Sequence, residues 1–318
     1  MTQHKHTVII DTDPGADDCA AILMALGLEQ LYSIKILGIT TVCGNVSVEY
    51  TTRNARIICD WANRQDVPIY QGATKPILNP LHDASEVHGE TGLAGALLHD
   101  PHTPLQEISA HFFLINTLKQ CSPQSITLCT LGPLTNIALA LLSEPSCQQG
   151  IKEIVIMGGN YLQQGNVTPN AEFNFFTDPL AAKIVLHSGV PLKIFPLDVT
   201  YKALVTTPRM NCLRQLNNQN GKRVADLLQS FSRFDIQQFG LEGGPLHDPC
   251  PIAYLVAPQY FSYRQVFATI EPYEGLMRGA MQVDWNRRQG HKPNSQWYYD
   301  IDADAFFKLL ENAIAQLP

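Results

Sequence analysis

Short apolar runs alternate with longer apolar or amphipathic stretches along the chain as far as residue 200. The short runs, which predict buried strands, are residues 7–10, 34–42, 68–70, 125–131, 153–157 and 192–197. The longer stretches, which predict helices, are residues 19–28, 48–63, 108–120, 134–142 and 179–187. Strands that alternate with helices are typical of a parallel sheet with helices on its faces. We therefore predict an α/β fold, Rossmann-like, with a mainly parallel central sheet flanked by helices.

The pattern changes after residue 200. Residues 208–239 are predicted to be mostly helical, and a Gly-rich turn then leads to a helix that begins near Pro249. Further strands are predicted at residues 265–270, 280–285 and 296–301, and a final helix at residues 303–316. Because no internal repeat or low-complexity linker divides the chain, we predict that residues 1–318 form one domain.

The composition is that of a globular protein. Of the 318 residues, 45% are hydrophobic and 16% are charged, which is enough for a sizeable core. The formal net charge of −7 gives no electrostatic attraction to nucleic acid or to an anionic membrane surface. No apolar run reaches the length that spans a bilayer. We therefore expect neither nucleic acid nor a membrane as a partner.

The cysteines and the N-terminus both suggest a cellular location. The cysteines are at positions 19, 43, 59, 121, 129, 147, 212 and 250, none in a C-x-x-C pair and most within apolar stretches. Such residues are typical of buried, reduced thiols. The first predicted strand begins without the apolar segment of a signal peptide before it. We expect a cytoplasmic protein.

Residues 11–18, which read Asp-Thr-Asp-Pro-Gly-Ala-Asp-Asp, form the most informative segment. They place four carboxylates on a Pro-Gly turn between the first predicted strand and the first predicted helix. Carboxylates this close repel one another and are costly to bury unless a cation lies between them. Helix capping accounts for Asp17 or Asp18, but it does not explain Asp11 and Asp13. Because all these ligands are carboxylate oxygens, the turn predicts a site for Ca²⁺ or Mg²⁺ rather than zinc.

Four further segments are weak signals when each is taken alone. In His247-Asp248-Pro249, Asp248 is expected to cap the helix that begins at the proline. Polar and aromatic residues are interleaved near residues 166–176, as in a pocket for sugar hydroxyls, although turns give the same composition. Residues 40–45 end a strand in Gly-Asn, and residues 88–92 read His-Gly-Glu-Thr-Gly. An ordinary turn and a solvated histidine would explain these last two.

Taken together and in this order, the segments resemble the motifs of the nucleoside hydrolases, the inosine–uridine-preferring family. The acidic turn is similar to the family's D-x-D-P-G-x-D-D signature after a strand. The other matching motifs are T-T-V-x-G-N at 40–45, H-G-E-T-G at 88–92, G-P-L-T-N at 132–136, M-G-G at 157–159, E-F-N at 172–174 and H-D-P at 247–249. The resemblance extends from about residue 7 to residue 256. It implies a Ca²⁺-dependent N-glycosidase that cleaves a ribonucleoside to ribose and free base.

The resemblance also implies roles for individual residues. The Ca²⁺ ligands would be the carboxylates of Asp13, Asp18 and Asp248 and the backbone carbonyl of Leu131, a position at which some members have Thr. The residues that would hold the ribose hydroxyls are Asp17, Asn45, Asn166, Glu172 and Asn174. Asp13 would in addition be the general base. His88 would contact the base, and His247 would protonate or orient it as the leaving group. For Asp11 we expect a supporting role through hydrogen bonds.

General chemistry agrees with these roles. Cleavage passes through a ribosyl cation, which carboxylates around the sugar stabilise, and direct attack by water inverts the anomeric carbon. Two alternatives stay open at this point. A non-catalytic ribose- or nucleoside-binding protein would use the same hydroxyl ligands. A DxD-type phosphohydrolase also begins with a strand and D-x-D, but Gly15 stands where that class needs a hydroxyl residue.

The base preference and the oligomeric state stay open as well. Some pyrimidine-preferring members have a Tyr and a Gln at the positions where this chain has Phe239 and Asp235. Phe239 lacks the hydroxyl that helps to protonate a leaving base, and Asp235 could accept from a base amino group or face solvent. Family members are commonly homodimers or homotetramers, so we expect a homo-oligomer.

Overall fold

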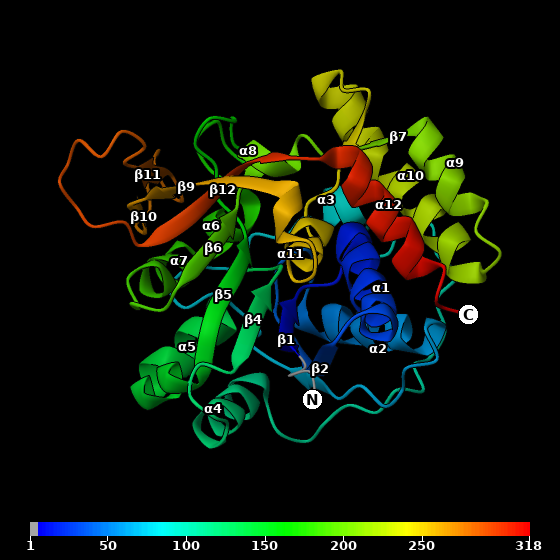
Figure 1. Cartoon of the computed structure of the whole chain (residues 1–318), viewed down its shortest axis with the longest axis horizontal. Helices are drawn as coiled ribbons and strands as arrows, with labels where there is room; N and C mark the ends of the chain where they lie inside the picture. Colours follow the sequence, from blue (N-terminus) through cyan, green and yellow to red (C-terminus); the bar gives the residue numbers. More distant parts are fainter. Residues whose placement is uncertain (1–5) are drawn as a thin grey trace.

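An eight-stranded sheet runs through the centre of the molecule (Figure 1). The computed structural model describes residues 6–318, apart from the side chains of residues 233–235 and 237–239. The strand order is β3-β2-β1-β4-β5-β6-β12-β9, and neighbouring strands are parallel except that β9 runs antiparallel to β12. The strands are β1 (His6–Thr12), β2 (Ile34–Thr41), β3 (Ile69–Gln71), β4 (Ile126–Thr130), β5 (Ile151–Met157), β6 (Leu192–Phe195), β9 (Phe261–Val266) and β12 (Ser295–Ile301). This confirms the predicted α/β fold.

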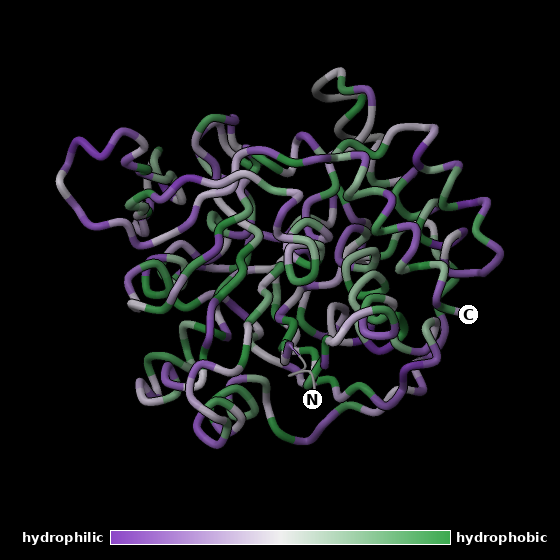
Figure 2. Tube along the Cα trace, in the orientation of Figure 1, coloured by the Kyte–Doolittle hydropathy of each residue, from purple (hydrophilic) through white to green (hydrophobic). Residues whose placement is uncertain are grey.

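Helices cover both faces of the sheet because successive strand residues point to opposite sides. In β1, Val8 and Ile10 belong to one apolar core and Ile9 to another, and all three are fully buried. The helices of the first core are α1 (Ala16–Leu31), α2 (Val48–Trp61), α9 (Thr207–Arg214), α10 (Gln219–Phe239), α11 (Pro249–Tyr254) and α12 (Ala303–Ile314). Those of the second are α4 (Ala110–Gln120), α5 (Thr135–Ser143) and α7 (Pro179–Leu186). Figure 2 shows the central strands as apolar and the loop before β12 as hydrophilic.

The chain reverses its direction across the sheet beside β1. It proceeds from β1 through β2 to β3 on one side, and then crosses to β4, β5 and β6 on the other. At such a reversal the connections that leave two neighbouring strands diverge, and open α/β sheets bind their ligands in the resulting crevice. The acidic turn follows β1 directly, so the topology places its carboxylates at this crevice.

Several elements differ from the prediction. Residues 208–239 form two helices, α9 and α10, because residues 215–218 interrupt the helical backbone. Residues 265–270 are divided between β9 and β10 (Ala268–Ile270), and β10 pairs with β11 (Met281–Val283) in a separate small sheet. Where only a Gly-rich turn was expected, β8 (Gly243–Pro245) pairs with β7 (Leu204–Thr206). The short elements that were not predicted are α3 (Ser85–His88), α6 (Phe173–Thr177), α8 (Leu197–Thr200), η1 (Pro145–Gly150) and η2 (Pro258–Tyr260).

Two predictions concern the cellular environment of the chain: that its cysteines are reduced thiols and that no segment spans a membrane. All eight cysteines are free thiols, of which six are buried, Cys121 is half-buried and Cys212 is exposed. Among residues 6–318, no helix combines the length and the hydrophobicity needed to cross a membrane. The cytoplasmic location stays a prediction.

Helix α1 packs against α12 at very short range. It is buried from Ala16 to Leu28, although it carries two aspartates in its first turn. A Cβ atom added to Gly27 would lie 2.0 Å from the carbonyl oxygen of Ala313 in α12. The two backbones therefore approach so closely that only glycine fits at this crossing.

We predict that Gly27→Ala destabilises the protein by about 1–3 kcal/mol, because the helices must separate to admit the methyl group. Helix propensity alone predicts a gain of about 1 kcal/mol. Gln30→Ala, at an exposed position of the same helix, is the control and should leave the stability nearly unchanged. Urea unfolding measures both variants, and a Gly27→Ala protein as stable as the wild type would contradict the prediction.

Candidate active site

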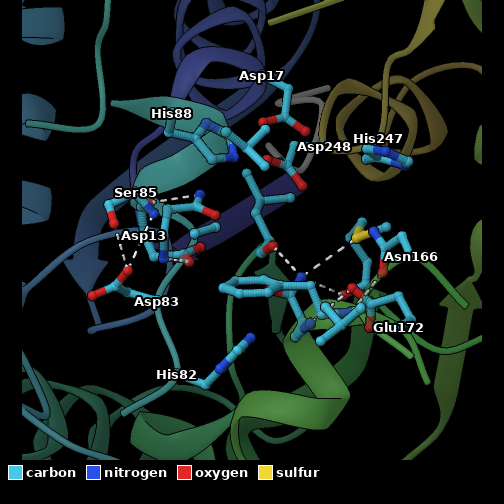
Figure 3. A pocket seen from close by; sticks show the side chains of 18 of the residues that line it. Asp13, Asp17, His82, Asp83, Ser85, His88, Asn166, Glu172, His247 and Asp248 are labelled. Carbon is cyan, nitrogen blue, oxygen red and sulfur yellow. Dashed lines mark hydrogen bonds between the residues drawn. The ribbon is translucent and has the colours of Figure 1, made fainter. Parts of the chain in front are cut away.

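A cavity of about 680 Å³ opens at the carboxyl ends of the central strands (Figure 3). The predicted site residues that line it are Asp13, Asp17, Asn45, His88, Leu131, Asn166, Glu172, Asn174, His247 and Asp248. Asp18 is fully buried behind them. Segments that are far apart in the sequence thus converge on one space. Among the described residues that line the cavity there is no Lys or Arg.

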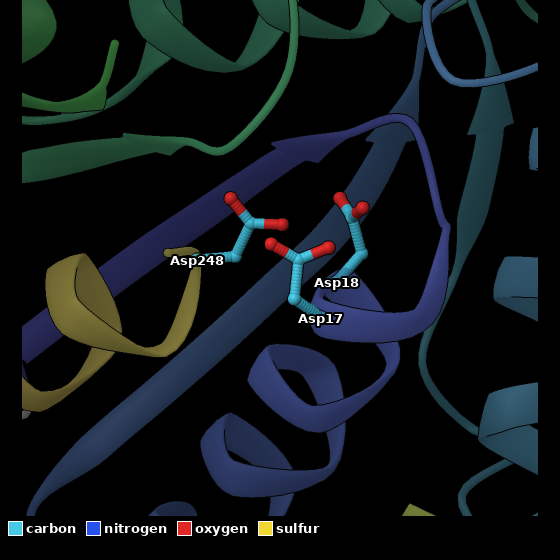
Figure 4. A group of neighbouring side chains, drawn as sticks. All are labelled: Asp17, Asp18 and Asp248. Carbon is cyan, nitrogen blue, oxygen red and sulfur yellow. The ribbon is translucent and has the colours of Figure 1, made fainter. Parts of the chain in front are cut away.

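Three carboxylates form the most acidic part of this site (Figure 4). Asp17 and Asp18 lie in the first turn of α1, and Asp248 lies at the start of α11. One oxygen of each lies within 4.8 Å of the others. Burial raises the pKa of Asp17 to about 8, with the Asp18 charge adding to the effect, and burial also raises the pKa of Asp18 and of Asp248. Because no Lys or Arg among the described lining residues neutralises these buried oxygens, the group fits a hard divalent metal ion.

The structure shows why Asp248 is not simply a helix cap. It occupies the N-cap position of α11, but its side chain accepts no capping hydrogen bond. The carboxylate instead lies beside those of Asp17 and Asp18. Asp248 is thus at the N-cap position, as expected, but its side chain does not form the capping hydrogen bond that the sequence context suggested.

The Asp18 carboxylate combines capping with a place in the acidic group. It accepts the backbone N–H of Gly15 at 2.9 Å, the side-chain amide of Asn45 at 3.0 Å and the hydroxyl of Thr12. The capping explanation and the metal-binding explanation of this residue are thus compatible. Because its donors come from the turn and from the segment after β2, the orientation of Asp18 is fixed from several sides.

The Asp13 carboxylate lies next to this group, in a space that only glycines leave open. It accepts the backbone N–H of Asn45 at 2.8 Å. A Cβ atom on Gly44 or on Gly132 would lie 2.0 or 2.3 Å from its oxygens. Burial and then the negative charge of Asp18 raise the pKa of Asp13 well above its usual range. Asp13 is not one of the three carboxylates within 4.8 Å of one another, so its role as a ligand stays a prediction.

Asp11 supports the site from within β1. Its carboxylate accepts hydrogen bonds from the hydroxyl of Thr40 and from the side-chain amide of Asn136, the latter at 2.8 Å. Asn136 also donates to the carbonyl oxygen of Thr41 and accepts the N–H of Ala73, both at 2.9 Å. Burial raises the pKa of Asp11 to about 7. Asp11 therefore joins β1, β2 and α5 beneath the cavity, in line with the supporting role expected for it.

A second polar wall comes from the segment around α6. The Glu172 carboxylate caps this helix and accepts the N–H groups of Asn174 at 2.8 Å and Phe175 at 3.1 Å, as well as that of Gly159 at 2.8 Å. Burial raises the pKa of Glu172 to about 7. The Asn174 amide donates to the carbonyl oxygen of Leu131 at 2.7 Å, which links α6 to the end of β4.

Asn166 stands on the same wall and is anchored in a similar way. Its side-chain oxygen accepts the N–H of Phe173 at 3.0 Å. In the view of Figure 3, Asn166 and Glu172 lie on one side of the cavity, and Asp83 and Ser85 on the other. The amides and the carboxylate of this wall are thus held by backbone groups before any ligand is bound.

Two buried histidines provide the remaining polar groups. The Nδ1 atom of His88 accepts the backbone N–H of Ala16 at 3.2 Å, so Nε2 carries the proton of the neutral ring. Burial lowers the pKa of His88 to about 4 and that of His247 to about 3, so both rings are neutral at pH 7. The ring of Phe231 lies 5.3 Å from that of His88 and 6.5 Å from that of His247, measured between centroids.

The sequence analysis missed part of the lining. The additional residues are Leu81, His82, Asp83, Ala84, Ser85, Glu86, Val87, Met157, Val167, Phe173 and Phe231. Most of them directly precede the H-G-E-T-G motif or lie within or beside the M-G-G and E-F-N motifs, so their proximity to the motifs was an available signal. Phe231 had no such signal, because it reaches the cavity from the middle of α10. The side chains of Asp235 and Phe239 lie outside the described residues, so their roles stay open.

Comparison with known proteins decides the family. The model of the inosine-uridine preferring nucleoside hydrolase family matches residues 8–308. The chain belongs to this family. Nucleoside hydrolases are metal-dependent enzymes, and the group of Asp17, Asp18 and Asp248 is where this chain could bind a metal ion. The family assignment excludes the phosphohydrolase and makes the chain a ribonucleoside hydrolase rather than a binding protein.

Individual nucleoside hydrolases are similar over the full length of the chain. The non-specific ribonucleoside hydrolase RihC of Salmonella typhi is 40% identical, and the alignment covers 100% of both chains. The pyrimidine-specific ribonucleoside hydrolase RihA of Enterobacter sp. is 38% identical and covers 97% of both. A solved structure of the purine-preferring ribonucleoside hydrolase from Gardnerella vaginalis superposes with a TM-score of 0.89 at 30% identity, covering 97% of this chain and 98% of that one.

The buried carboxylates predict how the stability of the nucleoside hydrolase depends on pH when metal is removed. The pKa of Asp17 in the folded protein is about 8, and the pKa values of Asp11 and Glu172 are about 7, all above the ordinary values near 4. The folded state therefore binds more protons than the unfolded state. In chelator, the free energy of unfolding should fall by about 2 kcal/mol as pH rises from 7 to 8.

Chemical denaturation across this pH range, with EDTA and with excess Ca²⁺, measures the effect. We expect the bound cation to remove most of the decline. Asp248→Asn, which takes one charge from the group, should raise the stability in EDTA and reduce the gain on adding Ca²⁺. A pH-independent stability in EDTA would show that the carboxylates do not oppose one another as the structure implies.

Proposed function

We propose that this ribonucleoside hydrolase uses Ca²⁺ to cleave the N-glycosidic bond of purine and pyrimidine ribonucleosides, with inversion at the anomeric carbon, in nucleoside salvage. The observation that carries the proposal is the arrangement of one cavity. Buried carboxylates gather at one part of it, anchored amides and Glu172 form a wall, and neutral histidines provide N–H groups. The names of the relatives, which include non-specific, pyrimidine-specific and purine-preferring enzymes, support a broad range of bases.

The donor set supports Ca²⁺ as the metal. The proposed ligands are the carboxylates of Asp13, Asp18 and Asp248 and the carbonyl oxygen of Leu131. All are hard oxygens, which Ca²⁺ prefers, and no cysteine, the ligand that favours zinc, is among the described residues that line the cavity. When bound, the cation would supply a positive charge that orients sugar hydroxyls and increases the acidity of water. The Asp17 carboxylate, which lies in the same group, would accept a hydrogen bond from a ribose hydroxyl.

The sugar would lie between this acidic group and the wall formed by Asn166, Glu172 and Asn174. The carboxylates can accept hydrogen bonds from ribose hydroxyls, and the side-chain amides, including that of Asn45, can both accept and donate them. Positive charge develops on the ribosyl group as the glycosidic bond breaks, and nearby carboxylates stabilise it. Without a ligand the carboxylates repel one another, whereas in the transition state they attract the positively charged ribosyl group.

Proton movements would involve Asp13 and the histidines. Asp13 would remove a proton from the attacking water, because the bound cation would keep this buried carboxylate ionised and so able to accept a proton. Attack from the side opposite the leaving base inverts the anomeric carbon. His88 would contact the base, and His247 would orient it and hydrogen-bond to it as it leaves. In the cell we propose a cytoplasmic homodimer or homotetramer that acts on small molecules, without nucleic-acid or membrane partners.

We predict that Asp13→Asn lowers kcat on inosine or uridine by about two to four orders of magnitude, the usual cost of losing a general base. The variant keeps the size of the side chain and its hydrogen-bond acceptor for Asn45. Its thermal unfolding and its calcium affinity should be measured beside the turnover, so that loss of the base is separated from loss of fold or metal. Turnover within threefold of the wild type would exclude Asp13 as the base.

A panel of inosine, adenosine, guanosine, uridine and cytidine tests the substrate and the metal together. We expect ribose release from several members, its loss in chelator and its recovery with Ca²⁺. Proton NMR during turnover should show α-ribose first, since inversion of a β-nucleoside gives that anomer. Equal activity in chelator or with Zn²⁺ in place of Ca²⁺ would overturn the metal assignment, and initial β-ribose would overturn inversion.

A further inference from the structure

Thr200, which none of the motifs contains, contacts the imidazole of His247. It is the last residue of α8, a short helix that follows β6, and it is fully buried. Its hydroxyl oxygen lies 2.8 Å from the Nδ1 atom of His247, although the two residues are 47 positions apart in the sequence. Because Nδ1 is engaged in this contact, Nε2 is the ring nitrogen that His247 can present to the cavity it lines.

The direction of this hydrogen bond follows from the burial of Thr200. Among the described residues, the Thr200 hydroxyl has no hydrogen-bond partner other than His247. If His247 donated to it, the hydroxyl proton would be left buried without an acceptor, which costs about 1–3 kcal/mol. If Thr200 donates to Nδ1, both groups are satisfied. The neutral ring then carries its proton on Nε2, as the ring of His88 does.

The short helix that holds Thr200 is itself firmly fixed. The Asp198 carboxylate, two residues earlier, accepts the indole N–H of Trp297 at 2.8 Å. It also accepts the backbone N–H groups of Tyr161 at 3.0 Å and of Leu162 and Gln163 at 2.9 Å. The residue before His247 is tied to the same region, because the N–H of Leu246 donates to the carbonyl oxygen of Ala203 at 2.9 Å. Hydroxyl and imidazole are thus held at a fixed separation.

We propose that Thr200 is a positioning residue that holds His247 in the tautomer with its proton on Nε2, so that an N–H group faces the leaving base. The inference rests on the proposed function in assigning the leaving base to His247. As the glycosidic bond breaks, the electron pair goes to the base nitrogen, and the Nε2–H group donates a hydrogen bond to it. The opposite tautomer would present a lone pair to that nitrogen and repel it.

The tautomer can be measured directly by ¹⁵N NMR of protein labelled at histidine, with His247→Gln used to assign the signals. In the wild type we expect a pyridine-type shift for Nδ1 of His247 and a pyrrole-type shift for Nε2. Thr200→Val, which keeps the shape but removes the hydroxyl, should move both shifts toward an average of the two tautomers. Thr200→Ser should retain the wild-type shifts. A wild-type ring protonated on Nδ1, or shifts unchanged by Thr200→Val, would overturn the proposal.

Kinetics test whether the tautomer matters for the reaction. We expect Thr200→Val to lower kcat on inosine about tenfold, a part of what a positioned proton donor contributes, while KM changes by less than about threefold. On p-nitrophenyl riboside, whose leaving group needs no proton donor, the variant should keep wild-type kcat. A purely structural defect would lower both rates equally and would count against the proposal.

Thr127→Val is the matched control. Thr127 also has a buried side chain whose hydroxyl lies 2.8 Å from a histidine nitrogen, Nε2 of His6, but at the other end of the sheet. The Thr127→Val variant should leave both rates unchanged.

If His247→Gln is as active as the wild type while Thr200→Val still alters the tautomer, the proposed role of His247 fails and the structural inference stands. If His247→Gln is impaired but Thr200→Val changes neither the shifts nor the rate ratio, the inference about Thr200 fails alone.

Discussion

The repulsion among buried carboxylates at the end of β1 is the constraint on which the rest of the site depends. Asp13, Asp17, Asp18 and Asp248 are all buried, which raises the pKa of each, and the charges of Asp17 and Asp18 raise the pKa of Asp13 and Asp248 further. Such a group persists only if the surrounding structure holds it in place. The donors around it come from elements that pack for other reasons: Asn45 after β2, the backbone of the Pro-Gly turn, and Thr12 in β1. The stability of the two apolar cores thus maintains a site that is unfavourable by itself.

Much of this arrangement was predictable because its signals lie in short, continuous segments of the sequence. The strands and helices of the first 200 residues have continuous apolar runs or clear periodicity, and the acidic turn is contiguous. The elements that were missed, such as α6 and α8, have four or five residues and follow from contacts rather than from periodicity. Asp248 illustrates the same limit. Its sequence context predicts a cap, and only the packing of α11 against α1 reveals that it faces two other carboxylates.

Thr200 and Phe231 show a second kind of limit. A threonine after Leu-Asp-Val carries no signal for a contact with a histidine 47 residues away, and a phenylalanine in a long amphipathic helix reads as a core residue. Both positions depend on how elements meet: α8 with the segment before α11, and α10 with α3. Motifs therefore identified most of the groups proposed to touch substrate and the supporting Asp11, while Thr200 and Phe231 became visible only in three dimensions.

The charges of the cavity are arranged to match the charges of the reaction. In the proposed orientation the sugar lies toward the carboxylates, where positive charge develops as the bond breaks. The base lies toward His88 and His247, which burial keeps neutral and which can offer N–H groups where negative charge develops. Charged histidines would pair with the nearby aspartates and weaken their effect on the sugar. Neutral rings of fixed tautomer avoid this, because they stabilise the departing base while leaving the negative potential around the ribose intact.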